Sequence, residues 1–138
     1  MKIVNRIIQF NQQEKLLLST GNSFRIVEIE SISHLQSWGS YTEIYLTNNK
    51  KIVTTTGLTI YEELLTNNHF FRVNKSSLVN LNQVENYNHK KRIIQLKSKA
   101  EIEVARRKQK DFVNAVFERT TRIATTKQNK RVEKALNL

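Results

Sequence analysis

Cysteine and proline are both absent from the 138-residue chain. Without cysteine the chain can form no disulfide and no thiolate metal site. Without proline no rigid linker separates two domains, and the length suits a single domain. No segment approaches the ~20 apolar residues of a membrane helix, and no cationic start leads into an apolar run as in a secretory signal. We therefore expect one cytoplasmic domain with no membrane partner.

Residues that build catalytic and cofactor sites are also scarce. Asp111 is the only aspartate among twelve acidic residues, and the three histidines lie far apart in the sequence. Magnesium sites and phospho-acceptor receiver domains need clustered aspartates, and zinc sites need closely spaced ligands. Three glycines cannot supply a glycine-rich phosphate loop. We expect no catalytic residue, no metal, no cofactor and no small-molecule substrate.

Positive charge is what the chain has in excess. It holds 23 lysines and arginines against 12 acidic residues, a net charge of +11. Between residues 104 and 138, ten basic residues face three acidic ones, so +7 of the +11 lies there. A solubilising surface usually mixes the two signs with a smaller net charge. The excess therefore indicates a polyanionic partner, and nucleic acid is the first candidate.

The residue pattern predicts mostly strands with short helices. Strands are expected from residue 15 to about 56, with turns at Gly21-Asn22 and Asn48-Asn49. The stretch GLTIYEELL has helical spacing, with Thr59 as a candidate cap. Further on, QVENYN and RIIQLK form a predicted hairpin joined by HKK, followed by a strand in AEIEVA and a helix in RRKQKDFVNAVFER. Residues 1–14 are a linker or an edge strand, and residues 119–138 are a basic helix or tail.

The stretch HFFRVNKSSLVN, residues 69–80, combines apolar anchors with hydrogen-bond donors. At least one of Phe70 and Phe71 is expected in the core, together with Leu78 and Val79. Between them, the short donor-capable side chains of residues 74–77 can face a phosphate backbone or base edges. A solvated loop is the alternative interpretation. Arg72 is expected to pair with a glutamate inside the fold, and Asn80 to close a turn.

Four ordered blocks resemble one family. They are ISHLQSWGSYTEIYL, TTTGLTIYEELL, FFRVNKSSLVNLNQVENY and IEVARRKQKDF. Together, from about Lys15 to Phe117, they resemble the LytTR DNA-binding domain of bacterial transcription regulators. Two positions depart from the family pattern, because Asn74 stands where a histidine is usual and Ala105 where a serine is usual.

The resemblance implies a mainly β fold: an elongated arrangement of small antiparallel sheets with short helices, here spanning residues 15–118. It also implies DNA contact through loops, with Arg106 entering a major groove and Tyr41 or Thr42 at a second contact point. Arg107, Lys108 and Lys110 open the last predicted helix, where backbone N–H groups favour phosphate. Trp38 is expected to pack in the core or at its rim, and Gly39 to allow a turn. The predicted DNA-contacting residues are Tyr41, Thr42, Asn74, Lys75, Ser76, Ser77, Arg106, Arg107, Lys108 and Lys110.

Family members are commonly output domains of two-component response regulators. No receiver domain is recognisable here, so the chain is either an excised output domain or a stand-alone regulator. The expected partner is double-stranded DNA with tandem half-sites about one helical turn apart, bound by two copies, with a homodimer on DNA. The alternative is a non-sequence-specific RNA or DNA binder that acts through its basic tail. A membrane-surface helix in the tail is disfavoured because the tail has few large apolar residues.

Overall fold

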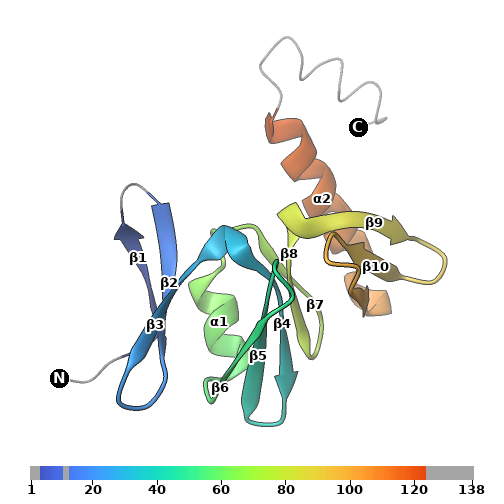
Figure 1. Ribbon diagram of the computed structural model, residues 1–138. Coiled ribbons are helices and arrows are strands. Elements are labelled where there is room, and N and C mark those ends of the chain that lie inside the picture. The colour runs from blue at the N-terminus through green and yellow to red at the C-terminus, as the bar shows by residue number, and fades with distance from the viewer. Residues whose placement is uncertain (1–3, 11–12, 124–138) are drawn as a thin grey trace.

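The computed structural model describes residues 4–10 and 13–123, and these form three antiparallel sheets in a row (Figure 1). The first sheet has the order β1-β2-β3, with strands β1 (Arg6–Phe10), β2 (Gln13–Ser19) and β3 (Phe24–Glu28). The second has the order β6-β5-β4-β8-β7, with strands β4 (Ile32–Trp38), β5 (Tyr41–Leu46), β6 (Lys51–Thr54), β7 (Phe70–Asn74) and β8 (Ser77–Asn80).

The third sheet has the order β11-β10-β9, with strands β9 (Val84–Asn88), β10 (Ile93–Leu96) and β11 (Glu101–Glu103). The helices are α1 (Leu58–Leu64) and α2 (Gln109–Ile123). Three 3-10 turns also occur, which are η1 (Ile29–Ser31), η2 (Leu81–Gln83) and η3 (Arg106–Lys108). Figure 1 shows α1 between the first two sheets and α2 against the third. The predicted fold class, mainly β with small antiparallel sheets and short helices, is confirmed.

Local sequence chemistry explains the strands and turns. On β5, Thr42 and Ile44 are fully buried while Tyr41 is 52% exposed, which follows the period-two alternation of a strand with one buried face. Gly21 and Asn49 occupy the predicted turns with φ of 79° and 69°, a left-handed conformation that glycine and asparagine tolerate best. The predicted turns are therefore confirmed.

Helix α1 forms where the helical spacing predicts it, although its start differs. Leu58, Tyr61 and Leu65 turn inward and are 4%, 0% and 0% exposed. The N-cap is Gly57, which makes no side-chain capping bond, so the prediction of a Thr59 cap is wrong. Thr59 lies one residue inside the helix, where its hydroxyl accepts a hydrogen bond from Arg72.

Two hydrophobic clusters share the β7–β8 hairpin. Phe70 and Leu78 belong to the cluster formed with the first sheet, α1 and the inner face of the second sheet. Val73 and Val79 belong to the cluster formed with the third sheet and α2, in which Phe112 is 1% exposed. The hairpin is therefore a wall between the two clusters. The expected core positions of Phe70, Leu78 and Val79 are confirmed.

The ends of the described chain extend the predicted elements. Residues 6–10 form β1, an edge strand of the first sheet. Helix α2 continues past residue 118, the predicted end of the domain. Arg119 still bonds to the body of the fold, because its Nη2 donates to Asn82 Oδ1 at 2.7 Å. Most of the predicted tail, residues 124–138, lies outside the described residues.

Candidate nucleic-acid interface

Three segments that are distant in sequence meet along one edge of the molecule. Ser37 N donates to Ser76 O at 2.9 Å and joins the β4–β5 turn to the β7–β8 turn. Ala105 N donates to Val73 O at 2.9 Å and joins the segment after β11 to the same hairpin. In Figure 1 both turns and the start of α2 lie along the lower side. We call this surface the cationic edge and define it as residues 38–41, 74–77 and 106–110.

The cations of the cationic edge have no internal partner in the described part of the chain. Lys75, Arg106, Arg107 and Lys110 are exposed, and Lys108 is partly buried. Within residues 4–10 and 13–123, none of these side chains makes a hydrogen bond or an ion pair. Their charges are therefore available to an external anion. Lys75 and Arg106 lie on the same edge, so one ligand can meet both.

The start of η3 adds backbone donors to the cationic edge. Ala105 precedes η3 without a side-chain capping bond, and Lys108 N is the first amide to close a turn, donating to Ala105 O at 2.8 Å. The amides of Arg106 and Arg107 therefore have no intrahelical acceptor. Amides at such a position, together with cationic side chains, suit a phosphate oxygen.

Two predicted contact residues are buried, so this part of the prediction is corrected. Thr42 is 0% exposed, and its hydroxyl donates to Thr56 O at 2.7 Å. Ser77 is 3% exposed, and its hydroxyl donates to Gln36 Oε1 at 2.9 Å. Each hydroxyl is consumed inside the sheet because the strand pleat turns it away from solvent. Both side chains support the edge and cannot contact an external partner.

Asn74 and Ser76 shape the β7–β8 turn. Asn74 Nδ2 donates to Glu103 O at 2.6 Å, and Asn74 Oδ1 accepts from Ser76 N at 2.8 Å. Asn74 Nδ2 therefore holds the turn against β11, and Asn74 Oδ1 closes the turn itself. Ser76 is partly buried, and between them Lys75 projects from the turn as an exposed side chain.

Trp38 differs from its predicted place in the core or at its rim, since 60% of it is exposed. The reason is the length of the neighbouring strand. The pairing of β4 with β8 ends at Gln36↔Ser77, so Trp38 extends beyond its neighbour and keeps only Tyr41 as a cross-strand partner. Gly39 follows with φ of 61° and closes the turn as predicted.

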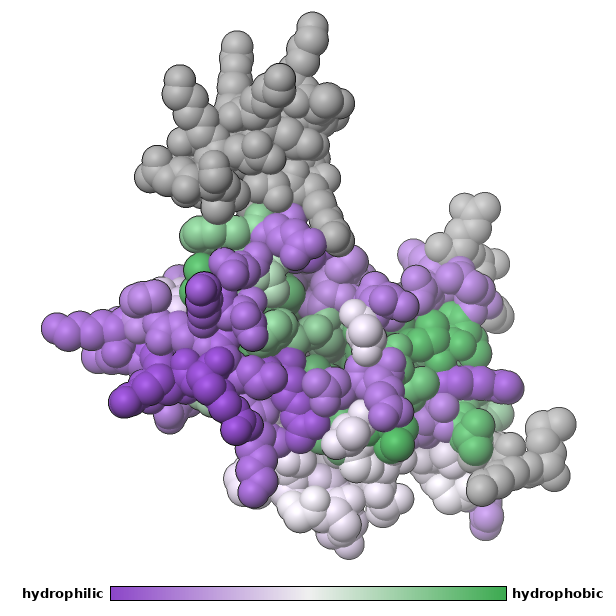
Figure 2. Space-filling model, turned by 180° about the vertical axis from the view of Figure 1, so that it is seen from behind, coloured by the Kyte–Doolittle hydropathy of each residue, from purple (hydrophilic) through white to green (hydrophobic). Residues whose placement is uncertain are grey.

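Sequence reasoning missed two cations next to this edge. Lys90 and Lys91 are exposed in the β9–β10 turn. That turn is tied to the start of α2, because Gln109 Nε2 donates to His89 O at 3.0 Å. Figure 2 shows a continuous hydrophilic surface at the left, over the β9–β10 hairpin and the start of α2. The run HKKR was a usable signal, but the sequence indicated only a turn.

Arg72 pairs with a glutamate and Asn80 closes a turn, as predicted. Arg72 Nη1 pairs with Glu62 Oε1 at 2.9 Å, and Arg72 Nη2 donates to Lys75 O at 2.6 Å. Asn80 is 0% exposed, donates to Ile32 O at 2.9 Å and caps η2 by accepting from Asn82 N at 2.9 Å. Arg72 therefore fixes the backbone of the turn that presents Lys75, whereas Asn80 fixes the opposite end of β8.

His34 has a structural role in β4. Its ring stacks on Tyr45 with centroids 4.5 Å apart, and only 7% of the residue is exposed. Burial lowers the pKa of His34 to about 4, because the charged imidazolium would lose its hydration. The imidazole is therefore neutral at pH 7.

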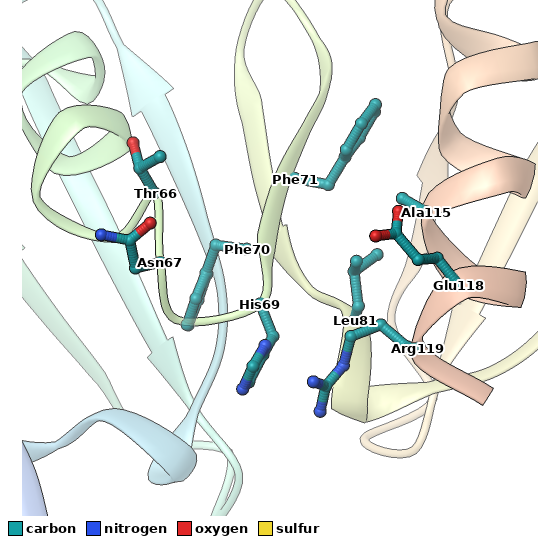
Figure 3. A pocket seen from close by; sticks show the side chains of 9 residues that line it. All are labelled: Thr66, Asn67, His69, Phe70, Phe71, Leu81, Ala115, Glu118 and Arg119. Atoms are coloured by element: carbon teal, nitrogen blue, oxygen red, sulfur yellow. The ribbon is translucent and has the colours of Figure 1, made fainter. Parts of the chain in front are cut away.

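A separate cavity of about 280 Å³ lies near the other end of α2 (Figure 3). Figure 3 shows Ala115, Glu118 and Arg119 reaching it from α2, and His69 and Phe70 from the α1–β7 connection. No group of three or more histidine or acidic side chains able to hold a metal ion occurs in the described part of the chain. None of the predicted DNA-contacting residues lines this cavity.

Comparisons with known proteins agree with this fold. The structure is similar to a solved LytTr DNA-binding domain of a putative methyl-accepting/DNA response regulator from Bacillus cereus, with 18% identity and a TM-score of 0.62. The match covers 74% of this chain and 95% of that one. A search of curated proteins gives no match. Among the described residues, no helix is long and apolar enough to cross a membrane.

The family comparison is the most direct. The family model for the LytTr DNA-binding domain matches residues 22–117, which include every strand from β3 to β11 and all three segments of the cationic edge. On the match to residues 22–117, together with the three-sheet fold, this chain belongs to the LytTr DNA-binding domain family.

Proposed function

We propose that the protein is a bacterial transcription regulator that binds double-stranded DNA sequence-specifically through its cationic edge. The observation that carries this proposal is the placement of Lys75 and Arg106 on one edge, exposed and without internal partners, on turns joined by backbone hydrogen bonds. The net charge of +11 supports a polyanionic ligand. Membership of a family of DNA-binding domains supports DNA as that ligand.

Each cation has a distinct role in this proposal. Arg106 binds a guanine in the major groove, where its planar fork can donate to O6 and N7 together. Lys75, on its braced turn, donates to a base edge or a phosphate. Arg107, Lys108 and Lys110 bind phosphates at the start of α2, and the Tyr41 hydroxyl binds another. The buried Thr42 and Ser77 and the internally bonded Asn74 position these groups.

In this proposal two copies bind tandem half-sites. One copy presents a single set of turns, so a second copy about one helical turn further along the DNA doubles the contacts on the same face of the duplex. The similar Bacillus cereus domain comes from a putative response regulator, which supports the proposal that this domain acts as a cytoplasmic output module of a two-component system.

The test is selection from a random duplex pool with the full chain, repeated at two salt concentrations. The expected result is a motif repeated at a spacing of about 10 base pairs, enriched at both concentrations, with overall affinity falling steeply as salt rises. Equal recovery of scrambled duplexes would instead favour a non-sequence-specific nucleic-acid binder. In that case removal of residues 124–138, which leaves α2 intact, should abolish most of the binding.

A further inference from the structure

Trp38 is the only tryptophan of the chain and an exposed one. Its cross-strand partner Tyr41 is 52% exposed, so two aromatic rings project from the same hairpin tip. Tryptophan carries a large apolar surface that normally packs inside a protein or against a partner. The lowest part of Figure 2 shows this tip as a pale surface beside the hydrophilic one. Exposed aromatic rings next to a cationic edge indicate a surface that a partner can cover.

The tip is part of the cationic edge and not an isolated loop. Ser37, the residue before Trp38, donates its amide to Ser76 O, so the backbone that carries the indole lies beside the turn that presents Lys75. The short turn between Trp38 and Tyr41 depends on Gly39 in the left-handed region, which fixes the direction of the hairpin. A duplex that contacts Lys75 therefore also comes close to the indole.

The indole N–H faces the Glu43 carboxylate and helps to lower its pKa, although Lys51 is the main cause of that shift. The same carboxylate accepts hydrogen bonds from Lys51 and from the Tyr45 hydroxyl. The carboxylate therefore stays ionised and keeps its donors. What Trp38 offers a partner is the apolar surface of its ring.

The chemistry of the duplex then restricts what the ring can contact. The major-groove edges of adenine, guanine and cytosine present hydrogen-bond donors and acceptors, whereas thymine adds an apolar group, its C5-methyl. The apolar face of an aromatic ring loses hydration without return against a polar edge but gains by covering a methyl. We propose that Trp38 recognises thymine in the target duplex through contact with its C5-methyl group.

This inference rests on the proposed function and adds a neutral specificity contact to the cationic ones. Because Trp38 carries no charge, its contact releases no counterions. Its contribution should therefore leave the slope of affinity against salt unchanged, in contrast to that of Lys75 or Arg107. A residue that holds only the hairpin shape would show no dependence on a single methyl group.

The experiment uses the full chain and the duplex recovered by selection. Each thymine is replaced in turn by deoxyuridine, which removes only the C5-methyl, and affinity is measured by fluorescence anisotropy of labelled DNA. At one thymine the wild type should lose about 3- to 10-fold. Trp38→Ala should bind about 10-fold more weakly and be insensitive to that replacement. Trp38→Phe, which keeps a ring, should retain part of the sensitivity.

A second readout comes directly from the single indole. Acrylamide quenching of tryptophan fluorescence should be strong in the free protein and reduced in the complex. Phe24→Ala, which removes a ring that is 51% exposed on β3, is the matched control and should not change the deoxyuridine profile. Equal quenching in free and bound protein overturns the inference, as does equal deoxyuridine sensitivity of the wild type and Trp38→Ala. Absence of any duplex binding overturns the proposed function as well, so the two failures are distinguishable.

Discussion

Polar side chains at the two ends of strands β4 and β8 differ in whether they have partners within the fold. At one end lies the cationic edge, where five lysines and arginines have no partner in the described part of the chain. At the other end Asn80, Asn82, Glu30 and Arg119 bond to one another and to the backbone, and we call these four residues the polar network. Polar groups of the network stabilise the fold, whereas those of the edge are kept available.

This comparison predicts that changes near the polar network affect folding and changes at the edge affect binding. His34, near the network end of β4, gives the largest expected effect. Its folded pKa of about 4 lies below the ordinary value of 6.5, so the unfolded chain binds a proton first as the pH falls. His34 therefore contributes full stability above about pH 6.5 and loses it towards pH 4, by up to about 3 kcal/mol.

Urea unfolding of the wild type and His34→Phe between pH 7 and pH 4 measures this term. Phenylalanine keeps a ring against Tyr45 but cannot titrate, so the variant should lose less stability on acidification than the wild type. His89→Gln, at an exposed position, is the control and should follow the wild-type curve. Parallel curves for wild type and His34→Phe would show that His34 does not carry the effect.

Asn80→Ala should be next in size. It leaves the buried Ile32 carbonyl and the Asn82 amide without their partner, which should lower the free energy of unfolding by about 2 to 3 kcal/mol. Thermal or urea unfolding measures the loss, and DNA affinity of the folded fraction should be unchanged. Asn114→Ala, on the exposed side of α2, should cost nothing measurable. An equal loss in both variants would contradict the role of the network.

Arg106→Ala should reverse this pattern. Stability should stay within about 0.5 kcal/mol, because the side chain is exposed and has no internal partner. Affinity for the selected duplex should fall by about 1 to 3 kcal/mol, with relaxed preference at one base pair. Anisotropy titrations against a set of single-base variants measure both. Unchanged affinity and unchanged preference would remove Arg106 from the interface.

Lys110→Ala should give the smallest effect and the most diagnostic one. Binding should weaken by less than about 1 kcal/mol and to the same extent for all sequences, while the slope of log affinity against log salt falls by about 1. Lys97→Ala is the matched control: the same charge is lost, but Lys97 lies beside η2, where its amide donates to Gln83 O. Equal slopes for the two variants would mean that net charge alone matters.

Local patterns predicted the elements of this fold well, and long-range contacts explain what they missed. Alternation on β5 and helical spacing on α1 depend on neighbours within a few residues, so the sequence predicts them directly. The exposure of Trp38 depends on where β8 begins, at Ser77, far along the chain. The amide of Asn74 is consumed by Glu103, 29 positions along the chain.

The candidate site shows the same division. Residue types and the family resemblance indicated the three segments, and the fold brings them to one edge. The sequence could not predict which side chains of those segments reach solvent, because the hydroxyls of Thr42 and Ser77 bond to acceptors outside their own strands. Lys90 and Lys91 lie next to the edge because Gln109 holds their turn, a contact over 20 positions.

The β7–β8 hairpin, whose two faces belong to different hydrophobic clusters, fixes the distance between two contact segments of the molecule. The interval between the turn of Lys75 and the segment of Arg106 is set by neighbouring backbones joined through Val73 and Ala105, and not by loop length. Lengthening an exposed turn would change the reach of one side chain but not that interval. To bind a ligand whose contacted groups are spaced differently, the protein would need changes in the packing of both hydrophobic clusters.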